Sequence, residues 1–201
     1  MSFPTLSSER LLLREIVMDD APQLLDIYKN KEAMRWFGTD PIQTLSEAQK
    51  YVEIFRDWRT QPNPATRWGI QRKDNNQLIG TCGLFKCEPN WKKCRIGYEL
   101  LPEVWAKGYM SEALTLIIPW GFSNMQLNRI EAFIHLNNIA SLRLVEKLNF
   151  QYEGCLREGG YWSHQFHDLL QYSLLRSDWC TSQYHKLSLL NKNSIKINKR
   201  V

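Results

Sequence analysis

Residues 98–113 read Tyr98-Glu99-Leu100-Leu101-Pro102-Glu103-Val104-Trp105-Ala106-Lys107-Gly108-Tyr109-Met110-Ser111-Glu112-Ala113. They predict a strand that passes through a short loop directly into a long helix. The first N–H groups of such a helix lack intrahelical acceptors, and the helix dipole adds positive potential, so the helix start suits an anion such as a pyrophosphate. Ala106 and Gly108 keep the loop slim, and Lys107 either adds positive charge or points to solvent. An ordinary strand-to-helix connection is the alternative interpretation.

The helix that follows, 109–125, is strongly amphipathic. Its apolar positions recur at helical spacing: Met110, Ala113, Leu114, Ile117, Ile118, Gly121 and Phe122. Turn residues and alternating patterns divide the rest of the chain. They predict strands at 9–16, 66–72, 77–86, 93–101, 129–136, 150–158 and 166–175, and further helices that begin near Asp19, Thr44 and Asn138. The resulting order, β-α-α-β-β-β-α-β-α-β-β, is that of a mixed α+β domain.

Charge divides the chain into two parts. The sequence holds 26 basic and 21 acidic residues, and five of the basic residues but none of the acidic ones fall in 181–201. Removing those five leaves 21 of each sign in 1–180, so this part is neutral by count. We predict one folded domain at 1–180 and a basic, mobile tail at 181–201. A neutral domain argues against nucleic acid as its main ligand.

Several classes of protein are disfavoured. No run approaches the ~18 apolar residues of a membrane span, and the first residues lack the basic and apolar regions of a secretory signal, so we expect a cytoplasmic protein with no membrane partner. The five cysteines are irregularly spaced with no Cys-x-x-Cys pair. His164 and His167 fall in a predicted hairpin where alternation puts them on opposite faces. We expect no metal site.

The loop has a family resemblance. Residues 105–113 resemble the acetyl-CoA loop of the RimJ/RimL-type enzymes in the GNAT superfamily of N-acetyltransferases. The wider superfamily pattern is Gln/Arg-x-x-Gly-x-Gly/Ala, and this chain departs from it with Trp105 first and Met110 last. Tryptophan at the first position is common in the RimJ/RimL branch, and only the backbone N–H of Met110 needs to face the phosphates.

Other segments resemble the same family in the same order, with coverage from about 6 to 179. Matching segments are 6–14 for the first strand, 95–100 for the fourth, 127–132 for the fifth, 138–150 for the helix beside CoA, and 153–157 and 168–175 for the closing strands. In the helix beside CoA, Asn149 stands where glycine is usual.

The resemblance implies a fold, an activity and a set of ligand contacts. The fold is a mostly antiparallel twisted sheet of about seven strands, splayed between the fourth and fifth and flanked by about four helices. The activity is direct transfer of acetyl from acetyl-CoA to a primary amine in a ternary complex. The implied acetyl-CoA contacts are Leu100, Leu101, Trp105, Ala106, Lys107, Gly108, Tyr109, Met110, Ser111 and Asn138.

Two residues are predicted to be catalytic. Glu99, near the end of the fourth strand, is the candidate general base because a partly buried carboxylate has a raised pKa; a simple ion pair with an arginine is the alternative. Glu15, Glu103 and Asp168 are weaker candidates for the base. By resemblance, Ser141 protonates the CoA thiolate; a hydrogen bond within the first helical turn is the alternative.

The acceptor remains open at this stage. An N-terminal α-amine, with a pKa near 8 against about 10.4 for lysine, needs less help to deprotonate, so we favour a protein N-terminus of the ribosomal-protein type. The tail could then contact the ribosome, and a homodimer is left open. A polyamine, amino acid or antibiotic acceptor would be favoured by an acidic pocket. A non-catalytic module that binds CoA, or RNA through the tail, is the third alternative.

Overall fold

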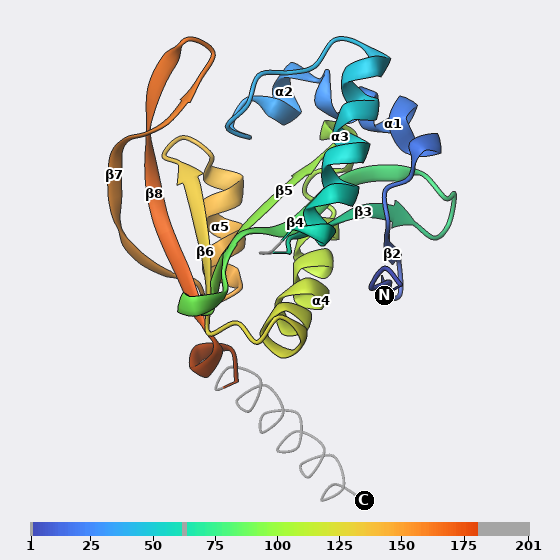
Figure 1. Ribbon diagram of the computed structural model, residues 1–201. Helices are drawn as coiled ribbons and strands as arrows, with labels where there is room; N and C mark the ends of the chain where they lie inside the picture. The colour runs from blue at the N-terminus through green and yellow to red at the C-terminus, as the bar shows by residue number, and fades with distance from the viewer. Residues whose placement is uncertain (1, 62–63, 181–201) are drawn as a thin grey trace, which may run out of the picture.

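The computed structural model describes residues 2–61 and 64–180, which fold around one sheet (Figure 1). Its strands, in chain order, are β1 (Leu6–Ser7), β2 (Leu11–Arg14), β3 (Thr66–Arg72), β4 (Leu78–Glu88), β5 (Lys93–Leu100), β6 (Arg129–His135), β7 (Gln151–Trp162) and β8 (Gln165–Leu175). The strand order across the sheet is β1-β2-β3-β4-β5-β6-β8-β7. All neighbours are antiparallel except β5 and β6, which run parallel.

Helices cover both faces of the sheet. The α-helices are α1 (Ala21–Tyr28), α2 (Lys31–Met34), α3 (Leu45–Asp57), α4 (Tyr109–Asn124) and α5 (Ile139–Lys147), and the short 3-10 helices are η1 (Met18–Asp20), η2 (Trp58–Thr60), η3 (Pro89–Trp91) and η4 (Pro102–Val104). Leu84 on β4 reaches toward Gly121 of α4. Its neighbour Gly83 is the partner of Arg67, whose guanidinium lies 5.4 Å from the Phe55 ring centroid of α3. Because adjacent strand residues point to opposite faces, α3 and α4 lie on opposite sides of the sheet.

The predicted mixed fold, splayed between the strands at 93–101 and 129–136, is confirmed, with local corrections. The strand expected at 9–16 is β2, and a two-residue strand, β1, precedes it, which makes eight strands in the described residues. A one-turn helix, α2, was missed because four residues are too short to show helical periodicity. Asn30 caps this helix and accepts hydrogen bonds from the N–H groups of Glu32 and Ala33, each 3.0 Å.

The last hairpin turns later than the sequence indicated. The strand expected at 150–158 was to end at 158, but β7 continues to Trp162. The turn residues are Ser163 and His164, with φ of 51° and 60°. Two consecutive positive φ values are typical of a type I′ turn, which usually carries Asn-Gly, so Ser-His gave no turn signal. The predicted tail, 181–201, lies outside the described residues.

A half-buried carboxylate fastens the start of α4 to the N-terminal strands. Glu112, in the first turn of α4, accepts hydrogen bonds from the Ser8 hydroxyl at 2.6 Å and from the Arg10 backbone N–H at 3.2 Å and Nε at 2.7 Å. Arg10 also donates to the carbonyl of Lys107 at 3.1 Å. Partial burial would raise the pKa of Glu112, but these bonds outweigh burial and hold the pKa below its ordinary value. The loop before α4 is therefore anchored at its base.

We predict that Glu112→Gln lowers the free energy of unfolding by about 1–2 kcal/mol at pH 7, a range discounted for the exposure of Arg10. Because the folded pKa is depressed, this stabilisation is present above the ordinary glutamate pKa of about 4.3 and is lost as the pH falls through the folded value. Urea denaturation should show the gap to wild type closing on acidification. Glu53→Gln, an exposed change on α3, is the control. Equal stability of Glu112→Gln and wild type at pH 7 would show that the anchor contributes nothing.

Candidate active site

The centre of the sheet is open. β5 and β6 pair only where Lys93, Cys94 and Arg95 face residues 129–131, and the remainder of both strands diverges. A cavity of about 690 Å³ occupies this divergence. Its floor is formed by Ile96, Gly97 and Tyr98 of β5 and by Ala132, Phe133 and Ile134 of β6. The exposed strand edges give the cavity backbone N–H and C=O groups that the sheet does not use.

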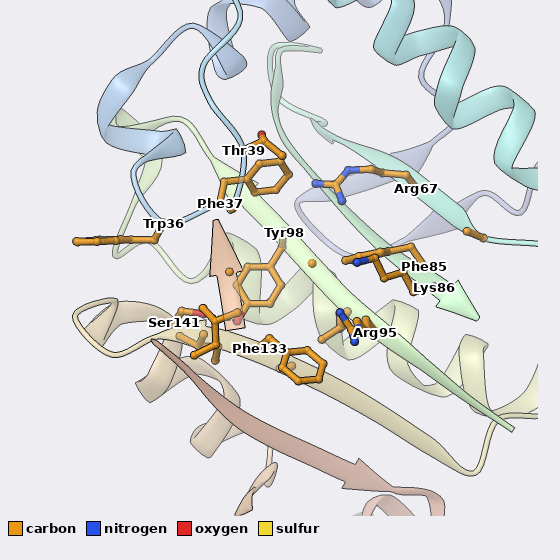
Figure 2. A pocket seen from close by; sticks show the side chains of 18 of the residues that line it. Trp36, Phe37, Thr39, Arg67, Phe85, Lys86, Arg95, Tyr98, Phe133 and Ser141 are labelled. Atoms are coloured by element: carbon orange, nitrogen blue, oxygen red, sulfur yellow. Dashed lines mark hydrogen bonds between the residues drawn. The ribbon is translucent and has the colours of Figure 1, made fainter. Parts of the chain in front are cut away.

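Aromatic side chains build the cavity wall (Figure 2). They come from the segment between α2 and α3, from α3 and η2, and from strands β4 and β7: Trp36, Phe37, Tyr51, Phe55, Trp58, Phe85 and Trp162. Trp58 stacks on Phe85 with ring centroids 5.9 Å apart. Trp36 stacks on His135 of β6 with centroids 4.1 Å apart. The wall therefore joins elements on both sides of the open strands.

Ser141 and Asn138 face the cavity from the start of α5. The Asn138 side chain caps the helix by accepting a hydrogen bond from the Ser141 N–H at 3.1 Å. The Ser141 hydroxyl lies 2.7 Å from the hydroxyl of Tyr98, a residue that the sequence did not single out. Burial raises the pKa of Tyr98 to about 12, with the Ser141 bond acting in the opposite direction. The phenol is therefore protonated at neutral pH and can supply a proton through Ser141.

Glu99 points to the face of β5 opposite Tyr98, the face that also carries Arg67 and packs against α3. Its carboxylate binds the guanidinium of Arg67 and the hydroxyl of Thr81, and the three side chains are buried. Burial raises the pKa of Glu99, while Arg67 and Thr81 act to lower it. Burial alone would lower the pKa of Arg67, but Glu99 outweighs it and the pKa is raised. Arg67 lines the cavity, whereas Glu99 is not among the described residues that do.

The loop before α4 begins where β5 ends. The Trp105 indole N–H donates to the Leu100 carbonyl at 2.8 Å, and Lys107 Nζ donates to the Glu103 carbonyl at 2.8 Å. Ala106 and Gly108 both have positive φ, 57° and 81°. Gly108 suits this conformation, and Ala106 adopts it at an energetic penalty, so the loop is held in one shape.

The start of α4 has backbone N–H groups with no acceptor inside the helix. The first bond of the helix joins the Glu112 N–H to the Gly108 carbonyl at 3.0 Å, which leaves the N–H groups of 109–111 ahead of it. Met110 is buried in the core, so its bulk does not obstruct the helix start. These features fit a pyrophosphate at the helix N-terminus.

The structure groups the predicted residues into three places. Leu100, Leu101 and 105–111 form the loop and helix start at the end of β5, Asn138 and Ser141 line the cavity, and Glu99 is buried against Arg67 of the cavity wall. Tyr98, Arg67 and Arg95 also line the cavity and were not predicted as site residues. Strand alternation shows only that Tyr98 and Glu99 point to opposite faces, so sequence alone could not say which of the two side chains reaches the cavity.

Residues 2–61 and 64–180 contain no group of three or more histidine, cysteine or acidic side chains arranged to hold a metal ion. No helix in that part of the chain is long and apolar enough to cross a membrane.

Comparison with known proteins identifies the architecture. The model of the acetyltransferase (GNAT) domain matches residues 10–151. The uncharacterized N-acetyltransferase YoaA of Bacillus subtilis is 35% identical, over 87% of this chain and 98% of YoaA. The putative ribosomal N-acetyltransferase YdaF of the same organism is 29% identical, over 86% of this chain and 94% of YdaF.

A solved structure agrees with these matches. The ribosomal L7/L12 α-N-protein acetyltransferase RimL, in complex with coenzyme A, superposes with a TM-score of 0.78 at 23% identity and covers 88% of this chain and 99% of that one. At this identity the likeness shows the fold. Together with the domain match over most of the chain, it leads to one conclusion: the protein is an N-acetyltransferase that belongs to the GNAT family.

Proposed function

We propose that this enzyme acetylates the N-terminal α-amine of a protein, with acetyl-CoA as the acetyl donor. The observation that carries the proposal is the charge of the cavity. Among the described residues that line it there is no aspartate or glutamate, whereas Arg67, Lys86 and Arg95 are basic. Polyamines and aminoglycosides carry several positive charges, and such a cavity repels them.

The same charges assist the chemistry on an α-amine. Only the neutral amine can attack the thioester, and an α-amine has an ordinary pKa of about 7.7–8.0. Nearby positive charge disfavours the ammonium form and moves that pKa lower. A bound α-amine is then largely neutral near pH 7.5. Lysine, at about 10.4, would need a dedicated base.

The names of the relatives agree with this acceptor class. YdaF is described as a putative ribosomal N-acetyltransferase, and RimL as an α-N-protein acetyltransferase. Both descriptions concern those proteins, and they support an α-amine acceptor here by kinship.

Backbone groups of the loop before α4, of the helix start and of the open strands provide the proposed acetyl-CoA contacts. The N–H groups of Tyr109, Met110 and Ser111 would hold the pyrophosphate, with Ala106 and Gly108 allowing close approach. The free edges of β5 and β6 would accept the pantetheine amides, and Asn138 borders that path. When bound, acetyl-CoA supplies the activated thioester.

Ser141 and Tyr98 serve the leaving group in this proposal. The amine nitrogen bonds to the acetyl carbon, the carbon–sulfur bond breaks, and the amine loses a proton to solvent. The Ser141 hydroxyl gives a proton to the sulfur and takes one from Tyr98, its 2.7 Å neighbour. Tyr98 then regains a proton from solvent, which balances the proton that the amine released. The products are an N-acetyl chain and free CoA.

Glu99 takes a positioning role in this proposal. Its carboxylate neutralises Arg67 and fixes the guanidinium in the cavity wall, where Arg67 contributes to the acid-free surface. The general-base role predicted from sequence stays a prediction, and it differs from the positioning role in its effect on the pH profile.

The acceptor is tested by measuring release of CoA thiol from acetyl-CoA with peptides of varied N-terminus, polyamines, aminoglycosides and amino acids. We expect turnover on peptides with a free α-amine and none on the same peptides when the N-terminus is blocked but lysines are free. Turnover confined to a small amine would overturn the proposed acceptor.

Ser141→Ala should lower kcat by about 100-fold, the low end of typical general-acid contributions, and Tyr98→Phe should act in the same direction because Ser141 then loses its donor. Acetyl-CoA binding by calorimetry should stay close to wild type in both variants. Tyr152→Phe, 56% exposed and outside the cavity, is the control. Wild-type kcat in both Ser141→Ala and Tyr98→Phe would remove the relay.

Glu99→Gln should lower the free energy of unfolding by about 3–5 kcal/mol, because Arg67 is left buried without its counter-charge. The double change Glu99→Gln, Arg67→Gln should recover part of that loss, as measured by urea denaturation. The pH profile of kcat/KM then separates the two roles of Glu99. A positioning role leaves the acid-side midpoint of the double variant where wild type has it; disappearance of that limb would establish Glu99 as the base.

A further inference from the structure

One end of the cavity carries two basic side chains with no acidic partner. Arg95 of β5 and Lys86 of β4 both line it, and Figure 2 shows their nitrogen atoms directed toward the open space. The Arg95 guanidinium lies 4.2 Å from the Phe133 ring centroid, which holds it against β6. This stacking occupies one face of the guanidinium and leaves its N–H groups available to a planar acceptor.

Nearby basic residues differ from Arg95 and Lys86 because each forms an ion pair with a carboxylate. Lys93 pairs with Glu88 at 3.2 Å, and Arg129 pairs with Glu131 at 2.8 Å and with Glu153. Glu131, which faces Arg95 in the β5–β6 register, is thus engaged by Arg129. Within the described residues, no hydrogen bond or ion pair joins Arg95 or Lys86 to a protein acceptor.

This basic end is distinct from the anion site at the start of α4. Arg95 precedes Leu100 by five residues on β5, which corresponds to about 17 Å of strand. The helix start follows Leu100, so the two sites lie at opposite ends of the strand. A cofactor pyrophosphate at α4 therefore leaves Arg95 and Lys86 for the acceptor.

The spacing from the reaction centre fits a short length of peptide. Tyr98, which contacts Ser141, lies three residues from Arg95, or about 10 Å of strand. An extended peptide advances about 3.3–3.6 Å per residue. From its α-amine, a side-chain carboxylate on the second or third residue reaches about that far. The α-carboxylate of a free amino acid lies much closer to its own amine and does not span this distance.

We infer that Arg95 and Lys86 form a specificity site for an acidic side chain at the second or third residue of the acceptor peptide. This inference rests on the proposed function and names the sequence class of its substrate. The guanidinium of Arg95 binds the carboxylate in a planar arrangement, and Lys86 adds charge from the exposed rim. An acceptor with lysine or arginine at those positions meets like charge.

The test uses three peptides that differ only at the third residue: Ser-Ala-Glu, Ser-Ala-Gln and Ser-Ala-Lys, each followed by the same neutral sequence. For the wild-type enzyme we expect kcat/KM to be roughly 10-fold higher for the glutamate peptide than for the glutamine peptide, a factor that corresponds to about 1.4 kcal/mol. The lysine peptide should be poorer still. A matched set with the change at the second residue locates the preferred position.

In Arg95→Gln, and more fully in Arg95→Gln, Lys86→Gln, the ratio of the glutamate to the glutamine peptide should fall to about 1, while KM for acetyl-CoA stays unchanged. Lys147→Gln, an exposed change on α5 outside the cavity, should keep the wild-type ratio. Equal kcat/KM for all three peptides in the wild-type enzyme overturns this inference and leaves the α-amine acceptor in place. Absence of turnover on every peptide, with turnover on a small amine, overturns the proposed function itself.

Discussion

The divergence of β5 and β6 is the constraint on which the rest of the site depends. Pairing over only three positions leaves the remaining backbone groups of both strands facing a cavity, an arrangement that a closed sheet would not allow. Each strand is held by its outer neighbour instead. β5 is paired to β4 over most of its length, and β6 to β8 over all seven residues. The domain is thus two half-sheets joined at one end.

The joined end is secured by more than the ladder. The N–H of Asn128 donates to the Lys92 carbonyl at 2.7 Å, just below the first paired residues. Arg129 binds Glu131 on its own strand and Glu153 on β7. Hydrogen bonds from Arg129 and Ser173 outweigh the effect of burial and hold the pKa of Glu153 at about 2, so this network persists well below neutral pH. The two strands are therefore fixed to each other at this end, and the cavity lies where they separate beyond it.

The order of the longer elements could be predicted from the sequence because their patterns are local. The long amphipathic helix, the caps at Thr44 and Asn138 and the run into α4 are each legible within one window of residues. The cavity wall is different, because it is built by residues far apart in the chain. The pairing of Arg67 with Glu99 crosses three strands, and the contact of Tyr98 with Ser141 joins a strand to a helix 43 residues away. No periodicity encodes such contacts, so the sequence offered an arginine partner for Glu99 as an alternative to the base role but could not identify it as Arg67.

The open ends of the two half-sheets are bridged by side chains at the cavity rim. The Trp162 indole donates to the Arg35 carbonyl at 3.3 Å, and the Ser163 N–H donates to Asp40 at 2.9 Å, so the β7–β8 hairpin reaches the segment around α2. Trp36 completes the bridge by stacking on His135 of β6. Burial, with His167 and Arg35 nearby, lowers the pKa of His135, and its Nδ1 accepts the Asn137 N–H at 3.1 Å, so the ring is neutral. The stacked His135 ring therefore adds no charge to the rim. Because Glu99 neutralises Arg67, the net positive charge among the described residues that line the cavity comes from Lys86 and Arg95, which β4 and β5 hold in place.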